Sequence, residues 1–132
     1  MKTKAVLGGA ELDAMLAAAR AKAQEIGIVA TIAIVDDGGY LFRLERADGA
    51  GVMTPAVATA KARTAALMRA PSGVLTSRLK EEPELLRLTD YLPMPGGLPI
   101  RWDGVCIGGI GISGGNAEQD VAIAEAGIAA LG

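Results

Sequence analysis

The sequence contains no histidine, and this absence limits the chemistry that the protein can perform. Histidine is the commonest general base and the commonest metal ligand in proteins. With a single cysteine, Cys106, the chain also lacks the ligands of an ordinary zinc site and cannot form an internal disulfide. We therefore predict no metal site, and any catalysis must rely on carboxylates, lysine, arginine, tyrosine, serine or Cys106.

Aromatic residues are few, and the net charge is small. Aromatics make up 3% of the chain, and 13 basic residues are balanced by 15 acidic ones to a net charge of −2. Nucleic-acid binding usually needs a basic surface and stacking side chains, so nucleic acid is not an expected partner. The apolar run near the N-terminus is too short for a secretory signal or a membrane span. We expect a cytoplasmic protein with no membrane partner.

Small and aliphatic residues are abundant instead. The chain is 51% hydrophobic and its mean hydropathy is +0.34. For a chain of 132 residues, which is the length of one domain, such a composition suggests that neighbouring subunits cover some apolar surface. We expect a single domain over residues 1–132 that forms a homo-oligomer.

Periodicity and turn residues in the first half predict a helix followed by a hairpin. Apolar residues recur at helical spacing over residues 11–26, and Gly27 ends the pattern. Two β-rich runs follow, at 29–35 and 40–45, joined by two aspartates and two glycines. This arrangement is typical of an antiparallel hairpin.

The second half repeats the combination of helix and hairpin. Thr54-Pro55 favours a helix start, and Pro71 ends that helix. Residues 72–90 suggest short helices broken at a proline, before a hairpin turns at Asp103-Gly104 and a final helix follows Asn116. Hairpins rather than alternating strands and helices predict an α+β fold, with an antiparallel sheet flanked by helices.

Three charged residues, at two places in the chain, are candidates for binding or catalysis. Arg46 and Asp48 follow the first hairpin, where arginine either grips a carboxylate or phosphate, or pairs with Asp48 to brace the turn. Lys61 lies on a helical face of small apolar residues. It is an anion anchor, a nucleophile, or a side chain that snorkels to the surface.

Glycines in the last hairpin are the other candidate contacts. Strand alternation places Gly109, Gly111 and Ser113 on one face, which clears space either for a ligand or for a closely packed helix. Cys106 falls on the opposite face and is expected to be an inert core thiol. Gly114 and Gly115 lead into the final helix, whose amides either bind an anion or are capped locally. Gly96 and Gly97 are the expected opposite lip of that anion site.

Four ordered motifs give the sequence a resemblance that covers nearly the whole chain. AIVDDGGYLFRLERADGA, KARTA, PGGLPI and GGIGISGGNAEQD are similar to the GlcG/HbpS family, also called the haem-degrading or PduO C-terminal domain family. The resemblance implies a five-stranded antiparallel sheet of profilin-like topology and assembly into dimers or octamers. A fifth strand is expected near Tyr91 to Met94.

The function that the resemblance implies is not uniform, because the family includes proteins of haem binding or degradation, corrinoid metabolism, glycolate oxidation and nitroaromatic breakdown. A haem site in this chain would need Tyr, Met, Cys, Lys or a hydroxyl as iron ligand, or none. Three hypotheses remain: a pocket for a small carboxylated metabolite, a haem or corrinoid site, and an assembly module without a ligand. In the first, Lys61 or Asp48 transfers a proton. The expected ligand contacts are Arg46, Gly96, Gly97, Gly109, Gly111, Ser113, Gly114 and Gly115.

Overall fold

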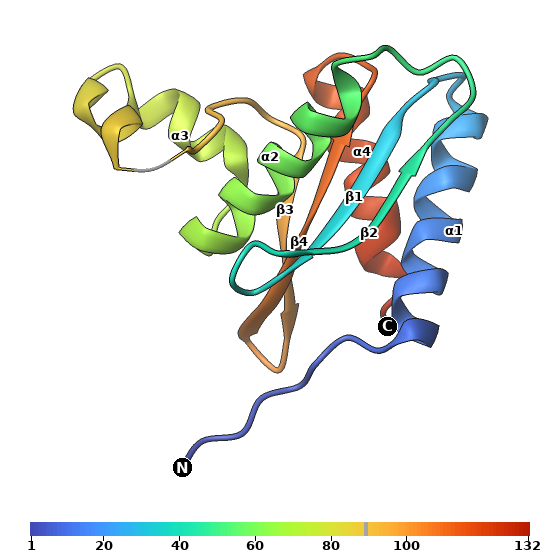
Figure 1. The fold of residues 1–132 in the computed structure, drawn as a ribbon, viewed down its shortest axis with the longest axis horizontal. Helices are drawn as coiled ribbons and strands as arrows, with labels where there is room; N and C mark the ends of the chain where they lie inside the picture. Colours follow the sequence, from blue (N-terminus) through green and yellow to red (C-terminus); the bar gives the residue numbers. More distant parts are fainter. Residues whose placement is uncertain (89) are drawn as a thin grey trace.

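The structure is a computed structural model that describes residues 1–88 and 90–132 (Figure 1). Its elements, in chain order, are α1 (Gly9–Glu25), β1 (Thr31–Asp36), β2 (Leu41–Arg46), α2 (Thr54–Met68), α3 (Ser72–Arg78), the 3-10 helix η1 (Pro83–Arg87), β3 (Gly97–Trp102), β4 (Val105–Ser113) and α4 (Ala117–Ala129). None of the helices in the described part combines the length and hydrophobicity needed to cross a bilayer.

The strands form one antiparallel sheet in the order β2-β1-β4-β3. The two predicted hairpins, β1 with β2 and β3 with β4, are both present, and β1 pairs with β4 to join them. The fold is therefore α+β with an antiparallel sheet, as the sequence predicts.

The prediction of a fifth strand near Tyr91 to Met94 is wrong: the sheet has four strands among the described residues. In this stretch the amide of Met94 bonds to the carbonyl of Leu92, two residues back, which turns the chain tightly. Pro93 and Pro95 also lack the N–H groups that a strand needs for its ladder.

Helices cover both faces of the sheet (Figure 1). Helix α2 lies on one face, over a core of small side chains. Helices α1 and α4 lie on the other, over a core of larger side chains that includes Met15, Ile34, Ile110 and Ile123. The central strand β1 is buried on both faces over its first five residues.

The backbone of α2 lies directly on the glycines of β3 and β4. A Cβ atom added at Gly111 would lie 2.5 Å from the backbone nitrogen of Ala62 and closer still to the carbonyl oxygen of Ala58. Added Cβ atoms at Gly97 and Gly109 would overlap other α2 carbonyl oxygens in the same way. The space that these glycines clear is occupied by the helix.

We predict that Gly111→Ala destabilises the protein by about 3 kcal/mol or more, because the new methyl group forces α2 away from the sheet. The midpoint of urea unfolding measures the change. Gly51→Ala is the matched control, since its added Cβ would meet its nearest neighbour at an ordinary 3.7 Å. Equal midpoints for the two variants would show that α2 does not pack as closely as described.

Candidate functional site

Lys61 is buried on α2, and its ammonium group has two partners inside the fold. Its side chain is 3% exposed. Nζ lies 3.0 Å from Oδ2 of Asp120 and donates a hydrogen bond of 2.9 Å to the carbonyl oxygen of Ile112. The ion pair leaves no free ammonium at the surface to anchor an anion, and the snorkelling alternative is not what the structure shows.

Asp120, which the sequence analysis did not single out, completes this buried pair. It lies in the first turn of α4 with its side chain 3% exposed, and its Oδ1 accepts a hydrogen bond of 2.8 Å from the amide of Gly115. Asp120 lies one helical turn before Ala124, which is also buried on α4. A carboxylate at helical spacing from an apolar residue of this helix was the signal that could have identified it.

The amides at the start of α4 are bound by the helix's own side chains. Asn116 and Gln119 cap each other, with two reciprocal hydrogen bonds of 2.9 Å from backbone N–H to side-chain oxygen. The amide of Gly115 is taken by Asp120. Local capping thus occupies donors that an anion beside Gly114 and Gly115 would need.

Gly96 and Gly97, the expected opposite lip, are buried inside the fold. The amide of Gly97 donates a 2.9 Å hydrogen bond to Oγ of Ser72. Gly96 has φ +120°, and a Cβ there would lie 2.9 Å from Nζ of Lys61. These glycines make room for Lys61 and α2, as Gly109 and Gly111 do for α2, so these four predicted contacts form a packing region.

Arg46, Asp48 and Ser113 lie at the end of the sheet where α2 begins. Thr31 pairs with Arg46 on one side and Ser113 on the other, which brings these two predicted contacts to the same end. Arg46 donates from Nε and Nη2 to the carbonyl oxygen of Ala50, at 3.1 and 2.8 Å, and so braces the loop in which Asp48 is exposed. Lys61, the other predicted catalytic residue, is buried away from that exposed loop.

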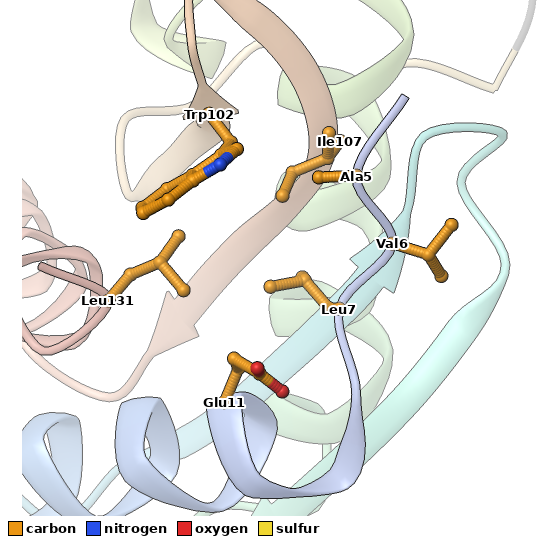
Figure 2. A pocket seen from close by; sticks show the side chains of 7 residues that line it. All are labelled: Ala5, Val6, Leu7, Glu11, Trp102, Ile107 and Leu131. Carbon is orange, nitrogen blue, oxygen red and sulfur yellow. The ribbon is translucent and has the colours of Figure 1, made fainter. Parts of the chain in front are cut away.

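A cleft that the sequence analysis missed lies near the turn of the second hairpin (Figure 2). Its volume is about 260 Å³. It is lined by Ala5, Val6, Leu7, Glu11, Trp102, Ile107 and Leu131, and we call it the Trp102 cleft. Its walls come from both ends of the chain as well as from β3 and β4, so no local motif could have revealed it.

The Trp102 cleft is apolar and open to solvent. Leu7 and Ile107 are 5% and 6% exposed, whereas Trp102, the only tryptophan of the chain, is 43% exposed. Figure 2 shows the side chains of Trp102, Leu131, Leu7 and Ile107 turned toward a common space, while Val6 points away. A half-exposed indole beside buried aliphatic side chains is a surface suited to a flat apolar ligand.

The ionisable group of the cleft is the carboxylate of Glu11. Its Oε2 accepts a 3.1 Å hydrogen bond from the amide of Gly8, which caps the start of α1. The N-terminal wall is held a little further along, where Lys4 bonds to Asp37 in the β1–β2 turn. That hydrogen bond holds the pKa of Asp37 below its ordinary value. The side chains that line the cleft therefore carry a negative rather than a positive charge.

We predict that Lys61→Met lowers the free energy of unfolding by about 3–5 kcal/mol, because it leaves the Asp120 carboxylate buried without a partner. Chemical denaturation measures the loss. The double variant Lys61→Met, Asp120→Leu should recover much of it, since both charges are then gone. A Lys61→Met protein as stable as the unsubstituted one would contradict the buried pair.

Known proteins resemble this chain over most of its length. It is 35% identical over 116 residues to an uncharacterised 15.0 kDa protein from the dhaT-dhaS intergenic region of Citrobacter freundii, with 84% of this chain and 82% of that protein covered. It is 34% identical over 114 residues to protein GlcG of Escherichia coli strain K12, covering 86% and 85%. The corrinoid adenosyltransferase PduO of Citrobacter freundii is 34% identical over 92% of this chain, which spans 38% of PduO.

Solved structures share the fold. The crystal structure of a double mutant of Streptomyces reticuli HbpS superposes with a TM-score of 0.93 at 32% identity, covering 100% of this chain and 91% of that one. A crystal structure described as a PduOC:heme complex gives a TM-score of 0.88 at 30% identity, covering 96% and 95%. The model of the haem degrading protein HbpS-like family matches residues 8–129, and the chain therefore belongs to that family.

Proposed function

We propose that the protein binds a tetrapyrrole, with haem as the first candidate, by apolar contact in the Trp102 cleft. The observation that carries the proposal is the cleft itself, with a half-exposed indole facing buried aliphatic side chains. A relative of the same fold, the PduOC protein, is described as a complex with heme. The alternative built on Lys61 is weakened because its ammonium is held by Asp120.

The dimensions and charge of the cleft fit one edge of such a ring. Ligand pockets usually measure roughly 300–1,000 Å³, so a cleft of about 260 Å³ takes part of a macrocycle and leaves the rest in solvent. Glu11 repels carboxylates, so the charged propionate edge of haem faces outward and the apolar edge enters. Trp102 and Leu131 then pack against the ring.

The cleft does not offer an ordinary ligand for iron. Its described lining contains no histidine, cysteine, methionine, tyrosine or lysine side chain, and the one carboxylate, Glu11, already caps α1. The residues fit the ring of haem but not its metal. We therefore propose binding of the ring without coordination of its metal.

We predict that haem quenches the fluorescence of the single tryptophan and saturates at a defined ratio, with a matching change in the haem absorption band. Leu131→Ala should weaken binding about tenfold, because losing about 1.4 kcal/mol of apolar contact changes Kd by that factor. Leu86→Ala, which truncates an exposed leucine on η1, is the matched control. Absence of saturable quenching, or equal Kd values for the two variants, would refute binding in this cleft.

A second candidate is a small carboxylate at the end of the sheet, where Arg46 and Ser113 flank Thr31. Arg46 is exposed, and its two hydrogen bonds to Ala50 leave further N–H groups on the guanidinium. Such a site would use Arg46 without Lys61, and Asp48 stays the candidate proton-transfer group. This site differs from the pocket expected from the sequence because Lys61, the second cation of that pocket, does not contribute to it.

We predict for this second candidate that millimolar glycolate or benzoate raises the melting temperature, and that Arg46→Ala abolishes the rise. Arg43→Ala is the control, because Arg43 lies on the same strand but extends toward Asp13 of α1, with Nε 3.8 Å from Oδ1. A rise that persists in Arg46→Ala, or no rise with either acid, would remove this candidate.

The expected homo-oligomer remains a proposal, and the edge strand β2 supports it. Leu41 and Leu44 are 52% and 39% exposed on this strand, which pairs within the described chain only with β1. Exposed apolar side chains on a free sheet edge favour contact with another copy.

A further inference from the structure

The Trp102 cleft offers contacts for the ring of a tetrapyrrole but none suited to the metal at the centre of that ring. Leu7, Ile107 and Leu131 are aliphatic, and the indole of Trp102 supplies a flat face and an N–H donor but no lone pair for a metal. The single group with oxygen lone pairs, the Glu11 carboxylate, is turned to the amide of Gly8 at the start of α1. The affinity that these contacts provide scales with the apolar area they bury.

Apart from Glu11, none of the described residues that could ligate iron lines the cleft, although Tyr40, Met53 and Met94 are exposed elsewhere. Lys61 is bound to Asp120, and Lys4 is bound to Asp37. The thiol of Cys106 is buried and directed to the carbonyl oxygens of Ala66 and Gly108, at 3.8 and 3.3 Å. Met15 is completely buried in the core. Histidine is absent from the entire sequence.

We infer that this chain recognises the apolar edge of a tetrapyrrole independently of the metal at its centre, so that a metal-free porphyrin is as good a ligand as haem. The inference rests on the proposed tetrapyrrole function and narrows it to a ligand class. An axial protein ligand adds affinity for the iron form alone, because a metal-free ring has nothing to coordinate. With apolar contact as the source of affinity, both rings bury the same surface and bind alike.

The test compares haemin with metal-free protoporphyrin IX on the purified full chain, with quenching of Trp102 as the readout for both. We expect the two Kd values to agree within about threefold, a difference below 1 kcal/mol. Leu131→Ala should weaken both by the same factor, because both rings meet the same leucine. Haemin binding more than tenfold tighter than protoporphyrin IX would overturn metal independence while leaving the tetrapyrrole proposal intact. Failure of both ligands to bind would overturn both.

The Glu11→Gln substitution tests whether Glu11, whose carboxylate is the one oxygen ligand among the side chains of the cleft, coordinates the iron. Glutamine at this position keeps the capping hydrogen bond to Gly8 but is a poor ligand for ferric iron. We expect the ratio of the two Kd values to stay the same in Glu11→Gln as in the unsubstituted protein. A selective loss of haemin affinity, with protoporphyrin IX unaffected, would show that Glu11 coordinates the iron and would overturn the inference.

Discussion

The close approach of α2 to the sheet determines where most of the other groups can lie. Because Gly97, Gly109 and Gly111 carry no side chains, the helix backbone rests on the strands, and Lys61 enters the interior with it. An ammonium group at that depth requires a counter-charge, which Asp120 supplies from α4. The start of α4 is therefore fixed to α2 by a contact between residues 59 positions apart in the sequence.

This dependence explains why the local features of the fold were predictable and the candidate site was not. The turns at residues 36–39 and 103–104 and the reciprocal cap of Asn116 and Gln119 depend on neighbours in the chain, and the structure contains all of them. The glycines of β4 suited a ligand and a packed helix equally well. Only the position of α2 in the tertiary structure shows that the glycines accommodate a helix rather than a ligand.

Two further misses have separate physical causes. The expected strand near Tyr91 to Met94 was inferred from family resemblance, although Pro93 within it and Pro95 just after it lack ladder donors. The Trp102 cleft combines Leu7, Trp102 and Leu131, which lie near the start, in the last quarter and at the end of the chain. No window of sequence contains the cleft, and the lone tryptophan at the end of β3 was its only local sign.

Because the cleft is walled by residues 5–7 on one side and by Leu131 on another, a segment joined to either end of this fold would start close to the cleft. An affinity tag at either terminus can therefore cover the indole of Trp102.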